Sequence, residues 1–208
     1  MNRAATRDSQ RPTDSAVRRG CAVASVLLLA AAVPAADSDN WPRFRGPAGT
    51  GHHQGTPLPT TWGATDILWR AELKGEGFSS PVTWGQRIFL TAATDKGRTR
   101  HVLALDGRDG RLLWERSIPC PSPGRVHAMN GHATPTCATD GKCVVAFFGE
   151  AGIHGFDLDG SPLWSRQVGD FPGPWGVAAS PVFSGGRVIL NCDAQGDSSI
   201  AALDSATG

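Results

Sequence analysis

The stretch LALDGRDGRLLW, residues 103–114, decides the fold of this chain. Its two apolar ends flank a turn rich in aspartate and glycine, which is the pattern of a β-hairpin. The glycines permit the positive φ values that a tight reversal needs. The pattern returns as GFDLDGSPLW at 155–164 and begins again as AALDSATG at 201–208.

A second marker recurs in step with the hairpin. The hairpin places its aspartates 51 and 47 residues apart, at Asp106, Asp157 and Asp204. The second marker is a Ser/Thr-Pro segment, whose prolines are 54 and 46 residues apart, at Pro81, Pro135 and Pro181. Because two markers recur in the same order with about the same period, the chain contains an internal repeat.

We therefore predict an all-β fold built from four-stranded antiparallel units, as in the blades of a β-propeller. The units cover about 77–116, 131–168 and 177–208, and the third unit lacks its fourth strand. The first strand of each unit is expected at about 79–83, 133–137 and 179–183.

Residues 67–73, ILWRAEL, resemble only the end of a unit. Such an isolated strand can complete the last sheet of a ring, so that no sheet edge is left unpaired. We predict that these residues form an N-terminal closing strand. Because propellers close with about 4–8 blades, about two and a half blades plus this strand are expected to be an incomplete ring.

The N-terminal 35 residues have the layout of a secretory signal peptide. Five arginines precede the apolar run CAVASVLLLAAAV at 21–33, and small residues follow at Val33-Pro34-Ala35. The run has 13 residues, fewer than the roughly 20 that span a bilayer, so an uncleaved anchor is the weaker alternative. We predict an exported protein, periplasmic or extracellular, with no transmembrane segment after cleavage.

Residues 36–66 form a lead-in rich in glycine and proline, which precedes the propeller at 67–208. Trp41, Phe44 and Trp62 are expected to pack across the domain, since large apolar side chains are seldom left in water. Arg43 and Arg45 alternate with aromatic residues and could bind an anion, although solvated arginines are the simpler interpretation.

The charge of the chain argues against nucleic acid as a partner. The formal net charge is +1 at pH 7. Without residues 1–35 the chain has 15 basic and 17 acidic residues, a net charge of −2, and it carries no basic run. Nucleic-acid binding depends on a basic patch that neutralises phosphates.

The repeats, together with the lead-in WPRFRGPAGTG, resemble the PQQ-like β-propeller family over residues 41–208. This family includes quinoprotein alcohol dehydrogenases and BamB-type propellers of outer-membrane assembly. The resemblance implies that the tryptophan ending each unit docks on the next blade, at Trp69, Trp114 and Trp164. It also makes the quinone PQQ and calcium possible cofactors.

The dehydrogenase members of the family carry a disulfide between adjacent cysteines beside the quinone. No two cysteines are adjacent in this sequence, and it contains no CxxCH haem motif. We therefore assign no catalytic residue, no cofactor-binding residue and no metal ligand from the sequence.

A disulfide between Cys137 and Cys143 is predicted from the hairpin that they flank. A three-residue loop, Thr139-Asp140-Gly141, would place the two cysteines opposite each other, where side chains are closest. They could then bond in an oxidising compartment. A two-residue turn would instead offset the pair and leave two free thiols. Nothing in the sequence pairs Cys120 with Cys192.

Two other groups of residues were considered as metal ligands. His127 and His132 are five residues apart with no third ligand at useful spacing, so hydrogen bonding in the loop is favoured. The segment DAQGD at 193–197 alternates Asp193, Gln195 and Asp197 but lacks a suitably placed glutamate, so a polar turn is favoured over a calcium loop.

The sequence thus favours an exported propeller that serves as a binding or scaffold module for other envelope proteins. The alternative is a piece of a quinoprotein dehydrogenase that oxidises an alcohol or sugar with PQQ and calcium. A carbohydrate- or polymer-binding propeller is a third, weaker hypothesis.

Overall fold

The computed structural model describes residues 39–53 and 57–208. The predicted signal peptide at 1–35 lies outside the described residues. Within these residues, eleven strands form three antiparallel sheets, and three short 3-10 helices occur at η1 (Ala64–Asp66), η2 (Asp95–Gly97) and η3 (Gly149–Ala151). Among the described residues, we find no helix with the length and apolar character needed to cross a bilayer.

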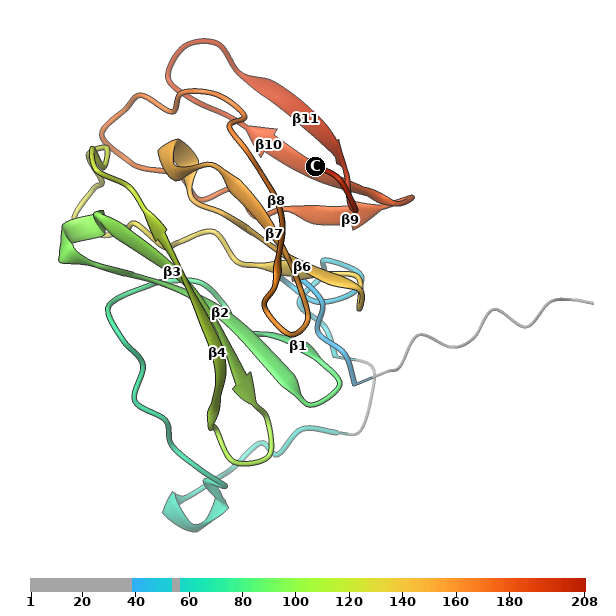
Figure 1. Ribbon diagram of the computed structural model, residues 1–208. Coiled ribbons are helices and arrows are strands. Elements are labelled where there is room, and N and C mark those ends of the chain that lie inside the picture. Colours follow the sequence, from blue (N-terminus) through green and yellow to red (C-terminus); the bar gives the residue numbers. More distant parts are fainter. Residues whose placement is uncertain (1–38, 54–56) are drawn as a thin grey trace, which may run out of the picture. The chain divides into compact units, whose positions relative to one another are not determined.

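Each sheet is one predicted unit, and its strands lie side by side in chain order (Figure 1). The all-β, four-stranded pattern is therefore confirmed. Blade one contains β1 (Val82–Trp84), β2 (Arg87–Thr94), β3 (Thr99–Asp106) and β4 (Leu112–Pro119). Blade two contains β5 (Ala138–Thr139), β6 (Cys143–Phe147), β7 (Ile153–Asp157) and β8 (Pro162–Arg166). Blade three contains β9 (Val182–Ser184), β10 (Arg187–Cys192) and β11 (Ser199–Asp204).

The period-two alternation of β6 builds the two cores of the domain. Val144 and Ala146 are buried against blade one, in a cluster that includes Val82, Phe89 and Trp114. Cys143, Val145 and Phe147 are buried on the other face, in a cluster with Val188 and Leu190 of blade three. Blade two is therefore covered on both faces, as expected for a blade inside a propeller.

The inner strands are shorter than predicted, and they start later. Residues 79–81 and 133–137 lie outside the ladders, and some of them bond to the neighbouring blade instead. The backbone N–H of Ser80 donates to Thr136 Oγ1, and that of Thr136 donates to Ser180 Oγ, each at 3.0 Å. Two hydroxyls therefore link the segments that lead into the three inner strands.

The register also corrects the alignment of unit two. Val82, Ala138 and Val182 occupy equivalent positions in their sheets, opposite Phe89, Val145 and Ile189. Cys137, and not Pro135, therefore corresponds to Pro81. The proline marker was misaligned by two residues in this unit.

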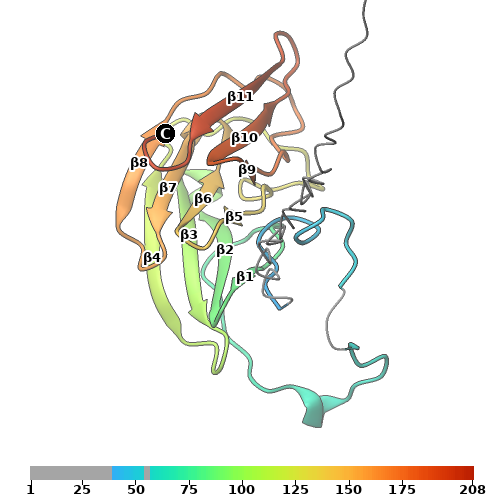
Figure 2. The ribbon, with the colours of Figure 1, turned by 90° about the vertical axis from the view of Figure 1, so that its right-hand side faces the viewer.

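The start of the lead-in, at residues 41–42, lies beside β1 and β5 (Figure 2). Trp41 forms an antiparallel bridge with Thr83, and the carbonyl of Pro42 accepts a hydrogen bond from Thr139 N–H at 2.9 Å. The expectation of packing is wrong for Phe44 and Trp62, which are 50% and 74% exposed. Arg43 and Arg45 donate to carbonyls of the lead-in itself, at Gly46, Pro47 and Thr50.

The predicted closing strand at 67–73 is not a strand in the described structure. It pairs with none of the three sheets of the described residues and remains an extended segment, with Leu68 almost fully exposed. Its tryptophan, Trp69, nevertheless contacts blade one.

Candidate functional site

Each of the three repeat tryptophans bonds to the turn of the following unit. The indole N–H donates to a backbone carbonyl at 2.9–3.0 Å in every case. The pairs are Trp69 with Gly107, Trp114 with Leu158, and Trp164 with Ser205. Because each acceptor directly follows the aspartate of its turn, the same contact recurs at every junction.

A glycine in each turn makes room for the indole. Gly110, Gly160 and Gly208 have φ values of 74°, 86° and 72°, which favour glycine. A Cβ at these positions would lie 2.4–2.8 Å from the tryptophan ring. The repeat signature of Asp, Gly and Trp is therefore an interlocking contact between blades.

The aspartate of each turn caps backbone N–H groups. One carboxylate oxygen accepts from Arg108 in the first turn, from Asp159 and Ser161 in the second, and from Ala206 and Thr207 in the third.

Hydrogen bonds from the Arg108 side chain and backbone lower the pKa of Asp106. Burial acts to raise the pKa of Asp157, but hydrogen bonds led by that of Ser161 outweigh it and lower the pKa. The Thr207 N–H and hydroxyl lower the pKa of Asp204.

These lowered pKa values predict acid sensitivity. A carboxylate with a depressed folded-state pKa stabilises the fold above its unfolded pKa of about 3.9, and this contribution is lost as pH falls through the folded pKa. We expect the unfolding midpoint in urea to be level from pH 5 to 7 and to drop below about pH 4. The triple variant Asp106→Asn/Asp157→Asn/Asp204→Asn should lose less of its stability between pH 5 and the acid range, whereas Asp109→Asn should behave like the wild type. If the urea midpoint of the triple variant fell below pH 4 as steeply as that of the wild type, the capping role of the three aspartates would be contradicted.

The structure corrects the predicted disulfide. Thr139 is opposite Val144, so the hairpin turns on Gly141 and Lys142, which is the two-residue alternative. The shift is an odd number of residues, which turns the two cysteines to opposite faces of the blade. Cys137 belongs to the core with blade one and Cys143 to the core with blade three. All four cysteines of the described residues are buried free thiols.

Burial raises the pKa of both Cys137 and Cys143 to about 12. We therefore expect these thiols to be unreactive in the native protein. A tryptic digest after alkylation in denaturant, without reductant, should release residues 126–142 and 143–166 as separate alkylated peptides, since Lys142 lies between the cysteines. If the two peptides were found joined by a disulfide, Cys137 and Cys143 would be bonded in the native protein, contrary to this expectation.

A buried ion pair joins blades one and two. Arg100 on β3 is 1% exposed, and its guanidinium lies 2.6 Å from a carboxylate oxygen of Glu150 on η3. Arg100 also donates to the Gly97 carbonyl, and the same Glu150 oxygen accepts from Gly124 N–H at 3.0 Å. This arrangement fixes the loops at one end of both sheets.

The loops at that end form a continuous surface. Antiparallel order places the β2–β3, β6–β7 and β10–β11 connections together with the linkers between blades. Phe78 lies against Gly131, and Val126 lies against Gly176, so successive linkers are in contact. We call the surface of residues 74–80, 120–135, 167–178 and 193–198 the linker face.

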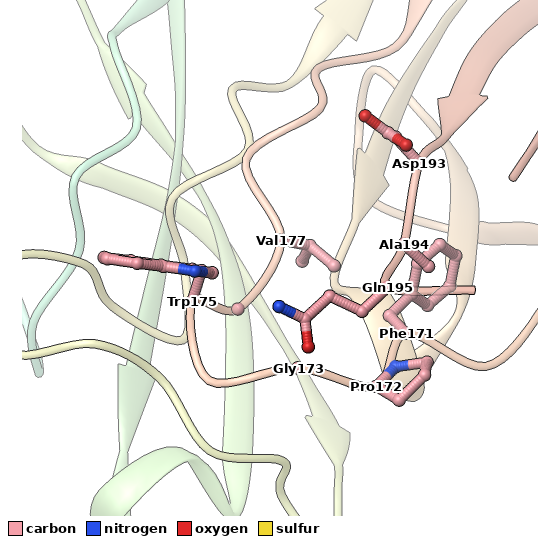
Figure 3. A pocket seen from close by; sticks show the side chains of 9 residues that line it. Phe171, Pro172, Gly173, Trp175, Val177, Asp193, Ala194 and Gln195 are labelled. Carbon is pink, nitrogen blue, oxygen red and sulfur yellow. The ribbon is translucent and has the colours of Figure 1, made fainter.

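A hollow of about 240 Å³ opens on the linker face between residues 169–178 and the β10–β11 loop (Figure 3). Trp175 and Phe171 lie on either side of Gln195, whose amide extends towards Trp175. Gln195 N–H donates to the Pro172 carbonyl at 3.4 Å, a long bond that links the two loops. An adjoining hollow of about 400 Å³ shares Phe171 and is lined also by Asp170 and Asp197.

The residues considered as metal ligands have other roles. The ring of His127 lies against that of Trp175, with centroids 4.5 Å apart and the planes tilted by 31°, while His132 packs against Gly97. Asp193 accepts a hydrogen bond from Ser198 within its own loop. Phe171 and Trp175 were missed from the sequence, although aromatic residues in the Pro/Gly-rich linker FPGPWG at 171–176 could have pointed to them.

The described residues do not fit the quinone–calcium site that the resemblance implies. Within 39–53 and 57–208, no three His, Cys, Asp or Glu side chains are grouped so that they could hold a metal ion. No cysteines are adjacent in the sequence. No chemical step is therefore derived through quinone or calcium.

Repeated four-stranded blades, docked through tryptophan and glycine, are the architecture of a β-propeller. Residues 62–208 match the family described as outer membrane protein assembly factor BamB. Because this match covers more than half of the chain, the chain belongs to that family. No match was found among curated proteins.

Solved structures are similar to this chain at low identity. Quinohemoprotein alcohol dehydrogenase from Comamonas testosteroni superposes with a TM-score of 0.58 and 18% identity, covering 85% of this chain and 27% of that one. BamB from Moraxella catarrhalis gives a TM-score of 0.46 and 21% identity, covering 68% and 41%. The computationally designed Ika4 protein gives 0.47 and 17%, covering 69% and 75%. The chain spans about a quarter of the dehydrogenase and two-fifths of BamB.

Proposed function

We propose that this chain belongs to an exported β-propeller that binds other envelope proteins through its linker face. The observation that carries this proposal is the exposure of large apolar side chains on three successive linkers. Phe78, Met129 and Trp175 are 60%, 80% and 56% exposed. Such groups on a surface favour association with a protein partner.

Two further features support the proposal. Membership of the BamB family is in keeping with a role in the envelope, and the N-terminal 35 residues have the pattern of a signal peptide. The dehydrogenase alternative has no comparable support, because the likeness to the Comamonas enzyme at 18% identity concerns the fold alone.

Photo-crosslinking at two ends of the blades tests the proposal. A photoreactive phenylalanine analogue is placed at positions 78 and 129 on the linker face, or at 109 and 159 in the turns at the opposite end. We expect adducts with one identified envelope protein from 78 and 129, reduced by unlabelled protein in excess. Equal adducts from all four positions, or adducts only from 109 and 159, would overturn the assignment of the binding face.

A further inference from the structure

We infer that the hollow beside Trp175 receives a lysine or arginine side chain of the partner. This inference rests on the proposed function, and it names the chemistry that the linker face recognises. The hollow joins the exposed surface of the linkers, so a side chain of a bound protein can enter it without rearrangement of the blades.

The charge of the lining favours a cation. Asp193 lines the smaller hollow, and Asp170 and Asp197 line the adjoining one. No lysine or arginine is among the described residues that line either hollow. Three carboxylates in a lining without lysine or arginine favour a negative potential, which attracts a positive side chain and repels an acidic one.

The aromatic residues provide the second part of the site. The ring of His127 lies against that of Trp175 at a tilt of 31°, yet more than half of Trp175 remains exposed. The face of an indole attracts lysine and arginine, with tryptophan the strongest of the aromatic residues in this interaction. Phe171 and Val177 line the same hollow and can contact the aliphatic stem of such a side chain.

Two polar side chains of the site can accept hydrogen bonds from a ligand. Asp193 is held by Ser198 through one carboxylate oxygen at 2.8 Å. The Gln195 side chain lies between the two aromatic residues (Figure 3) and offers a carbonyl oxygen to an ammonium or guanidinium group. A neutral sugar could also bond to Gln195 and stack on Trp175, so it forms the competing outcome of the test.

Calorimetric titration of the full chain with tetralysine at low salt tests the inference. We expect binding that weakens in 0.5 M salt and falls at least tenfold in Trp175→Ala and in the double variant Asp193→Asn/Asp197→Asn. Trp62→Ala and Asp109→Asn are matched controls, because they change an exposed tryptophan and an aspartate outside the hollow. Circular dichroism of each variant verifies that the fold is retained.

Three results would overturn the inference. One is equal binding of tetralysine by the wild type and both variants, and another is equal binding of tetralysine whose amines are acetylated. The third is a maltotetraose titration that depends on Trp175 while tetralysine does not bind. If tetralysine binding depends on Trp175 but no envelope protein is crosslinked from positions 78 and 129, the inference about the hollow stands and the proposed function fails. If crosslinking succeeds but tetralysine does not bind, the proposed function stands and the inference about the hollow fails.

Discussion

Trp114→Ala should lower the free energy of unfolding by about 3–5 kcal/mol, as truncation of a buried aromatic side chain does. Trp114 is buried between blades one and two, with its ring centroid 6.0 Å from Phe89 and 6.2 Å from Phe156. Its removal leaves a cavity in the first core and deprives the Leu158 carbonyl of its donor. Urea denaturation followed by circular dichroism measures the change.

Two variants separate the packing of Trp114 from its hydrogen bond. Trp114→Phe keeps much of the apolar volume but loses the N–H, so we expect a loss of about 1–3 kcal/mol. Gly160→Ala adds a Cβ 2.6 Å from the indole at a φ of 86°, and should destabilise by about 1–3 kcal/mol. Trp62→Ala, at an exposed tryptophan, should change stability by less than about 0.5 kcal/mol. Equal effects of Trp114→Ala and Trp62→Ala would refute the docking role.

Arg100→Met should lower the free energy of unfolding by about 3 kcal/mol, because it leaves the Glu150 carboxylate without its buried partner. The guanidinium of Arg100 is almost fully enclosed between blades one and two, and it bonds to both Gly97 and Glu150. Denaturation in urea at pH 7 gives the change. In the double variant with Glu150→Gln, part of the loss should return, since no charge is then left unpaired.

A second ion pair between the same blades provides the control. Arg87 and Asp159 are also 2.6 Å apart, but their side chains are 37% and 80% exposed. Solvent screens such a pair, so Asp159→Asn should change stability by less than about 1 kcal/mol. If the Arg100 and Asp159 variants had equal effects, or if Arg100→Met and Glu150→Gln were strictly additive, the buried pair would have no special role.

The sequence predicted the blades because their signature consists of contacts that are local or repeat with a fixed period. Asp106 caps its own turn, and Gly110 allows the left-handed backbone there. Trp114 bonds to the turn of the second unit in the same way as Trp69 bonds to the turn of the first. Such features follow from residue type and spacing, without knowledge of the rest of the fold.

The predicted disulfide failed because it depended on register. A three-residue loop and a two-residue turn are both compatible with the sequence around Gly141, and they place Cys143 on opposite faces of the blade. The core decides between them: Val144 packs towards blade one, so Cys143 must point towards blade three. The closing strand at 67–73 failed for a related reason, because a strand requires a partner edge.

The candidate site could not be predicted because it is assembled from distant segments. Trp175 lies in a linker, and Asp193 and Gln195 lie in a hairpin loop of the next blade. The sequence singled out DAQGD as a possible ligand loop but gave no indication that an aromatic linker lies against it. Contacts between loops depend on how the blades stack, which no local pattern specifies.

The most direct test of the binding hollow is the indole N–H spectrum of the full chain, labelled with ¹⁵N and titrated with tetralysine. Single Trp→Phe variants assign the resonances. The indole of Trp175 should shift with saturation, whereas those of Trp114 and Trp164, bonded to the Leu158 and Ser205 carbonyls, should remain fixed. A saturating titration that leaves Trp175 unmoved, or that shifts the docked tryptophans instead, would contradict the account.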